Sequence, residues 1–129
     1  MLNFVAMTGR LTKDPELRTT QSGTTVATFT LACERDLKNH EGKRETDFFD
    51  CVAWRTTGEF VAKTFHKGDG VSVTGRLQTR QYTDHDGNKR RATEIMVANC
   101  YFQLTKAEVH TQTGTMPIIV DEDDDSLPF

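Results

Sequence analysis

The hydrophobic positions of the first hundred residues alternate with polar ones, which is the pattern of β-strands that bury one face. In residues 26–33, for example, Ala27, Phe29 and Leu31 fall on one face and threonines on the other. Residues 95–98 are instead continuously apolar, as in a strand covered on both faces. The strands expected from these patterns are residues 3–11, 26–33, 48–54, 71–82 and 93–104. The chain is therefore predicted to be mainly all-β.

Glycines occur at two kinds of position in this pattern, in the loops between strands and inside strands. Gly-containing loops at residues 39–42 and 84–88 lie between expected strands and predict hairpins. Gly9 and Gly75 instead lie inside strands, each within a Thr-Gly-Arg-Leu sequence. Glycine inside a strand indicates a sharp bend or a close backbone approach, as at the corners of a small closed barrel. The alternation of residues 71–82 places Gly75 and Leu77 on the inward face.

One short helix is expected between the third and fourth strands. Thr56 and Glu59 have the spacing of a capping box, and Gly68 can end the helix. The expected apolar stripe comprises Phe60, Val61, Thr64 and Phe65.

Periodicity ends near Lys106, so we expect two parts, a folded domain of residues 1–105 and a disordered acidic tail of residues 106–129. The tail contains the acidic run 121–125 and ends in an apolar tip. For most acidic runs solubility is the better explanation, but an apolar tip can fill a pocket with a basic rim on a partner. The residues expected to bind partners are Asp123, Asp124, Asp125, Leu127, Pro128 and Phe129.

Composition narrows the class of protein. The 129 residues, 36% of them hydrophobic and 27% charged, suffice for one domain. A membrane span would need about 18 apolar residues in succession, and a secretory signal a longer apolar start, so neither is expected. The three cysteines form no CxxC pair, and the four histidines are far apart in the sequence. We therefore expect reduced thiols, a cytoplasmic location and no metal or other cofactor. Because no nucleophile elbow, phosphate loop or paired-acid motif occurs, we expect no enzyme.

Charge is distributed unevenly along the chain. Through Lys106 there are 16 Lys and Arg against 13 Asp and Glu, and six further acids follow with no base. A basic body with an acidic end is typical of proteins that bind polyanions.

Aromatic and basic residues coincide on the expected outer strand faces. Phe48 and Trp54 lie six positions apart on one strand, and Tyr82 shares a strand face with Arg76 and Arg80. Bases stack on aromatic rings while Arg and Lys follow the phosphates, so this combination favours unpaired nucleic acid. The alternatives are that the aromatics lie under a loop or in a subunit interface and that the basic residues are ordinary surface charges. The residues expected to bind the nucleic acid are Phe48, Trp54, Tyr82, Arg10, Arg35, Lys43, Arg44, Arg55, Arg76, Arg80, Lys89, Arg90 and Arg91.

Several segments resemble the bacterial and phage single-stranded DNA-binding proteins. They are Met1-Leu2-Asn3, residues 9–18, Phe29-Thr30-Leu31-Ala32, Val52-Ala53-Trp54, Lys67-Gly68, residues 75–80 and the acidic tip ending in Pro128-Phe129. The resemblance implies a five-stranded OB-fold, which is a Greek-key barrel, assembled as a homotetramer that wraps single-stranded DNA without sequence specificity. It places the family's stacking aromatics on Phe48, Trp54 and Tyr82. The chain departs from the family pattern at Phe4, where a basic residue is usual, and at Leu37, where a ring is usual.

The function expected from this resemblance is protection of single-stranded DNA and recruitment of replication, recombination and repair proteins through the tip, in the cytoplasm of a bacterium or encoded by a phage. Two other functions stay open from the residues. An OB-fold module that binds RNA would use the same stacking surface. A primosomal-type adaptor of the replisome would have a similar body, although such adaptors usually lack an acidic tip.

Overall fold

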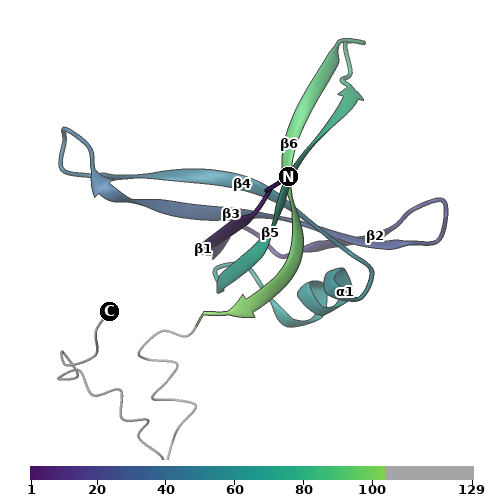
Figure 1. Cartoon of the computed structure of the whole chain (residues 1–129), viewed down its shortest axis with the longest axis horizontal. Coiled ribbons are helices and arrows are strands. Elements are labelled where there is room, and N and C mark those ends of the chain that lie inside the picture. Colours follow the sequence, from purple (N-terminus) through teal and green to yellow (C-terminus); the bar gives the residue numbers. More distant parts are fainter. Residues whose placement is uncertain (104–129) are drawn as a thin grey trace, which may run out of the picture.

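A computed structural model describes residues 1–103, which form six strands and one helix (Figure 1). The elements are β1 Val5–Leu11, β2 Glu16–Thr19, β3 Thr25–Lys38, β4 Arg44–Trp54, α1 Arg55–Thr64, β5 Gly70–Thr83 and β6 Lys89–Phe102. The predicted domain boundary at residue 105 and the predicted acidic tail lie outside the described residues. Within residues 1–103, the ten residues of α1 are too few for a helix to cross a membrane.

Five strands close into a barrel in the order β1-β5-β6-β4-β3, and the circle is completed where β3 pairs with β1. The closing pairs are Arg10 with Ala32 and Leu11 with Leu31. β4 and β6 run parallel, whereas the other neighbours are antiparallel. This order, with the helix between β4 and β5, is that of the OB-fold. The predicted fold class is therefore confirmed.

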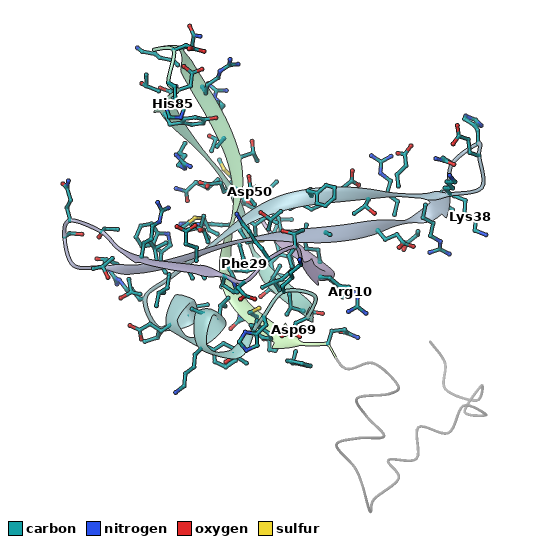
Figure 2. The ribbon with its side chains drawn as sticks, turned by 180° about the vertical axis from the view of Figure 1, so that it is seen from behind. Arg10, Phe29, Lys38, Asp50, Asp69 and His85 are labelled. Carbon is teal, nitrogen blue, oxygen red and sulfur yellow. The ribbon has the colours of Figure 1, made fainter. Side chains whose placement is uncertain are left out.

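The core fills the barrel and is closed at one end by α1. Phe29, Leu31, Ile95 and Val71 project inward and are 3% exposed or less. Figure 2 shows Phe29 at the centre of the molecule. From the helix side, Val61 and Phe65 are fully buried and belong to the same cluster. The inward positions of residues 26–33 are thus those that the alternation predicted.

β2 was not predicted. It pairs with the start of β3, and the connecting turn is held by Thr20, whose Oγ1 accepts a hydrogen bond from the Thr24 N–H at 3.1 Å. All four of its residues are exposed. A strand that buries no face has no hydrophobic alternation, so the pattern could not reveal it.

The predicted capping box is wrong. The N-cap of α1 is Trp54, which makes no side-chain cap hydrogen bond. The chain passes from β4 into the helix at Arg55, which has a φ of 57°. Phe60 is half-exposed, and the helix ends at Thr64, before the turn that contains Gly68.

Two expectations of burial are also wrong. Leu77 is 46% exposed and Ala98 is exposed, although Leu77 was expected to face the core and residues 95–98 to be covered on both sides. The strand register shifts between Thr74 and Gly75, and beyond this bulge β5 and the start of β6 leave the barrel as a hairpin. Leu77 lies in this arm, where no second layer covers it, and Ala98 is the extra residue of the bulge, between Val97 and Asn99.

Gly9 and Gly75 lie where the prediction required close backbone approach. A Cβ at Gly75 would lie 2.1 Å from the Met96 carbonyl oxygen, and one at Gly9 would lie 2.7 Å from the Ala32 carbonyl oxygen. Any side chain at these positions would therefore push two paired strands apart.

The β2–β3, β3–β4 and β5–β6 hairpins project from the barrel in different directions (Figure 1). The β3–β4 arm, residues 34–46, and the β5–β6 arm, residues 76–91, contain no buried residue. Their turns are the two that were predicted: Asn39 Oδ1 accepts hydrogen bonds from Glu41 and Lys43, and Asp84 Oδ1 accepts them from Asp86 and Asn88.

Candidate nucleic-acid interface

The outer face of β4 carries two exposed aromatic rings. Phe48 is 64% exposed and Trp54 is 40% exposed, whereas Cys51 and Ala53 on the opposite face are buried. The cause is local, because alternate residues of a strand face opposite sides. The predicted placement of both rings on the outside of the barrel is therefore confirmed.

Strand pairing places one arginine in the same lateral row as each ring. Arg10 of β1 pairs with Ala32 of β3, which pairs with Phe48. Similarly, Arg18 of β2 pairs with Val26 of β3, which pairs with Trp54. Residues in one row share a face, so the Cα atom of each arginine lies two strands, or roughly 10 Å, from that of the aromatic residue. This is the combination of ring and cation that a stacked nucleotide needs. The Arg10 guanidinium itself donates a hydrogen bond to the Gly68 carbonyl oxygen at 2.8 Å.

A groove of about 520 Å³ lies between the outer face of β2, β3 and β4 and the base of the β5–β6 arm. Trp54 and Met96 contribute its apolar surface, and Arg18, Gln78 and Arg80 its donors. The full lining is Arg18, Thr19, Thr20, Val26, Thr28, Val52, Trp54, Gln78, Arg80, Glu94 and Met96. A shallow groove with a ring on one wall and guanidinium groups on both sides suits an extended, unpaired strand.

Arg80 is held in place on the arm side of this groove. Its Nε donates a hydrogen bond to Glu94 Oε1 at 2.9 Å, and its guanidinium lies over the Tyr82 ring with Cζ 5.3 Å from the centroid. Tyr82 is 43% exposed. The structure thus brings the predicted residues Arg80, Tyr82 and Trp54 to one side of the molecule.

An acid also lies on this face. Asp50 is exposed on β4 between Phe48 and Trp54, and its Oδ1 accepts a hydrogen bond from Thr30 Oγ1 at 3.1 Å. Within residues 1–103 it takes part in no ion pair. Figure 2 shows Asp50 where β4 meets the base of the β5–β6 arm, away from Lys38 and His85 in the two arms.

Two of the three predicted basic residues of the β3–β4 arm, Arg35 and Arg44, are paired with neighbouring acids. Arg35 donates to both carboxylate oxygens of Asp47, at 2.9 and 3.0 Å, and to Glu45 at 2.7 Å. The hydrogen bonds from Arg35 lower the pKa of Asp47. Arg44 lies 3.7 Å from Glu34. Lys43 lies in the turn of the arm, far along it from Trp54.

The basic cluster of the β5–β6 arm is divided between two faces. Arg90 pairs with Tyr82 across the arm and donates to Asp84 at 2.9 Å, and this bond lowers the pKa of Asp84. Lys89 and Arg91 project from the opposite face, because neighbours in a strand alternate. The three residues therefore do not form one patch.

The remaining predicted cations, Arg55 and Arg76, lie at other places. Arg55 is exposed at the start of α1, directly after Trp54. Arg76 lines a separate hollow of about 440 Å³ with Phe4, Val97 and Ala98. Phe4 is 67% exposed there.

The cysteines are core residues rather than nucleophiles. Burial raises the pKa of the Cys100 thiol to about 11 and also raises the pKa values of Cys51 and Cys33. Within residues 1–103, no group of three or more His, Cys, Asp and Glu side chains could hold a metal ion.

Arg18 is a groove residue that was not among the residues expected from the sequence to bind nucleic acid. The signal that could have found it is short: Glu16 and Arg18 alternate with Leu17, and Gly23, with a φ of 85°, marks the turn into β3. Its position in the lateral row of Trp54 depends on the register of β2 with β3 and of β3 with β4, which no local pattern indicates.

Comparison with known proteins places this geometry in context. Residues 2–103 match the model of the single-strand binding protein family. The chain is 49% identical to single-stranded DNA-binding protein 2 of Listeria monocytogenes over 102 residues, which cover 79% of this chain and 64% of the relative. It is 50% identical to single-stranded DNA-binding protein A of Bacillus subtilis over 102 residues, covering 79% and 59%. A protein of Enterococcus faecalis called single-stranded DNA-binding protein is 47% identical over 116 residues, covering 89% and 61%. The chain thus spans less than two thirds of the length of these relatives.

Proposed function

Because the chain belongs to the single-strand binding protein family, we propose that it binds single-stranded DNA without sequence specificity, by base stacking and phosphate contacts. The observation that carries the proposal is the exposed ring of Trp54 on the wall of a groove that also presents Arg18 and Arg80. Stacking accepts any base because every base has a π-face, and the arginines contact phosphates, which all nucleotides share. The role is binding and protection, not catalysis.

Affinity measurements with three matched ligands test this function. A labelled oligo-dT, an oligo-U of the same length and a DNA duplex are titrated with the protein, and anisotropy is recorded. We expect oligo-dT to bind most tightly and the duplex to bind weakly, because paired bases hide the faces that would stack. Equal or tighter binding of oligo-U would identify an RNA-binding module instead. Binding of none of the three would favour an adaptor whose partners are proteins.

The second part of the proposal concerns the acidic end of the chain. We propose that Asp123, Asp124 and Asp125 steer the apolar tip, Leu127, Pro128 and Phe129, to a pocket with a basic rim on replication, recombination and repair proteins. Phe129→Ala should abolish capture of such enzymes and leave affinity for oligo-dT nearly unchanged. If the run only confers solubility, capture of these enzymes will survive the substitution, because the acids remain.

We propose a homotetramer as the assembled form. Met1, Leu2 and Phe4 are more than 60% exposed, and Phe4 lines a hollow with Val97 and Ala98, so this end of the chain presents apolar surface for another subunit. Light scattering measures the mass directly. Phe4→Glu should lower the mass if this surface joins subunits, and an unchanged mass would place the contact elsewhere.

The proposed site of action is the bacterial cytoplasm. All three cysteines are free thiols, as is usual in that reducing compartment.

A further inference from the structure

We propose that Asp50 gives this surface a bias in base composition, favouring bases that carry an exocyclic amine and disfavouring thymine. The inference rests on the proposed function, because it concerns bases bound along the outer face of β4. It is carried by the position of one carboxylate between two stacking rings.

The position of Asp50 is unusual for a surface that binds a polyanion. The residue projects from the same face of β4 as Phe48 and Trp54, two residues after the first ring and four before the second. Two residues of a strand span roughly 7 Å, about the width of a base. A base stacked on Phe48 or next to it therefore presents its edge to this carboxylate.

The carboxylate is oriented rather than freely rotating. Thr30 lies directly across from Asp50 on β3, and its Oγ1 donates to Asp50 Oδ1 at 3.1 Å. This bond occupies one oxygen and leaves Oδ2 as an acceptor. A β-branched threonine has few χ1 rotamers, so the donor itself is well positioned.

Electrostatics separates the role of Asp50 from that of the arginines. A carboxylate repels phosphates, so the sugar-phosphate backbone must pass beside the cations rather than over Asp50. Arg10 lies in the lateral row of Phe48 and Arg18 in that of Trp54, both on the far side of β3 from β4. With phosphates directed to that side, the base edges lie over β4, where Asp50 projects.

An acceptor at a base edge distinguishes the four bases. Cytosine, adenine and guanine each present an exocyclic –NH₂ that can donate to a carboxylate, and acidic side chains accept from cytosine N4 in known complexes. Thymine has no exocyclic amine. Its single edge donor, N3–H, lies between two carbonyl oxygens, whose lone pairs the carboxylate repels. Cytosine and thymine are therefore the sharpest comparison, because both are small pyrimidines with similar stacking surface.

The experiment compares the affinity of the full chain for oligo-dC and oligo-dT of equal length at pH 8, where oligo-dC stays unpaired. The measured quantity is the ratio of the two affinities in wild type and in Asp50→Asn, in which the amide both donates and accepts. We expect the substitution to lower the dC:dT ratio about three- to ten-fold, the usual net effect of one hydrogen bond. Most of the change should be a gain in affinity for oligo-dT.

Glu59→Gln is the matched control. Glu59 is exposed on α1 rather than on the outer face of β4, and the substitution removes the same charge. It should leave the dC:dT ratio unchanged. Thr30→Val is the second variant: it keeps the β-branched shape and the Asp50 charge but removes the donor, so the ratio should fall part of the way.

Three outcomes overturn the proposal. Equal gains for both oligonucleotides in Asp50→Asn would mean that the carboxylate acts only as a charge. No change for either would mean that bases do not pass Asp50, and an unchanged ratio in Thr30→Val would refute orientation by Thr30. Failure of the wild-type protein to bind either oligonucleotide would instead refute the proposed function.

Discussion

The fluorescence of Trp54 reports directly on binding at the proposed surface. Trp54 is the only tryptophan of the chain, and its ring is 40% exposed on the groove wall. If a base stacks on it, oligo-dT should quench the intrinsic fluorescence strongly. Trp54→Ala should weaken binding by about 1–3 kcal/mol, the usual contribution of one base–aromatic stack.

Phe60→Ala provides the control for this prediction. Phe60 is also a half-exposed aromatic, at 49%, but it lies on α1 in edge contact with Phe65, outside the groove lining. Its loss should leave DNA affinity unchanged. Emission that does not change at saturating DNA would remove Trp54 from the proposed contact.

At the level of single residues, the sequence predicted what alternation alone determines. Phe48 and Trp54 had to share a face opposite Cys51, whatever strand lay beside them. The residues that strand pairing brings near those rings could not be predicted from the alternation. Arg18 lies in the lateral row of Trp54, and Thr30 lies directly across from Asp50, through pairing registers between distant segments. Arg35 is paired with two acids of the next strand. Such registers are set by the whole sheet, so a local pattern cannot supply them.

Among the elements, β5 depends most on one small residue. A Cβ at Gly75 would lie 2.1 Å from the Met96 carbonyl oxygen, at the bulge where the arm begins. Gly75→Ala should therefore lower the free energy of unfolding by about 1–3 kcal/mol or more, because strand backbone must move to admit the methyl group. Denaturant unfolding followed by circular dichroism measures this.

Gly70→Ala is the matched substitution for this test. A Cβ there would lie 3.4 Å from both the Cβ and the carbonyl oxygen of Gln103, which is an ordinary van der Waals distance. The cost should be well below that of Gly75→Ala. Equal costs would show that close approach at the bulge is not what requires glycine.

The two faces of the β5–β6 arm should differ in their contribution to binding. Arg80 is directed toward the groove by Glu94 and Tyr82, whereas Arg91 projects from the other face of the arm. Arg80→Gln should lower affinity for any sequence and reduce the salt slope by about 0.7, the share of one phosphate contact in a single strand. Affinities at several salt concentrations measure the slope.

Arg91→Gln is the control on the same arm, and it should leave the slope unchanged. The opposite ranking of the two substitutions would place the bound strand on the far face of the arm.

Elements with a buried face were predictable, and elements without one were not. The alternation in residues 26–33 and the glycines of the barrel corners located β3 and the bulge. The all-exposed β2 gave no signal. The helix itself was predicted from Val61 and Phe65, but its start was not, because the chain enters it through Trp54 and Arg55 rather than through a capping side chain.

For the whole molecule, the described part combines a small closed core with arms that extend beyond it. The excess of three positive charges through Lys106 is modest, and several cations are paired with acids. Affinity should therefore come from the groove and its rings more than from a general positive field.

The arms have a consequence for local stability. No residue of 34–46 or 76–91 is buried, so each arm is held by its cross-strand hydrogen bonds and surface pairs alone. Such regions open without unfolding the rest of the domain.

In amide hydrogen exchange, the arms should lose protection within the shortest times while the barrel portions of β1, β3 and β5 stay protected. Saturating oligo-dT should slow exchange at the base of the β5–β6 arm, beside the groove. Uniform protection across barrel and arms in the free protein would contradict this. If the arms open locally in the free protein, they become ordered when the strand binds, and the entropic cost of this ordering lowers the affinity.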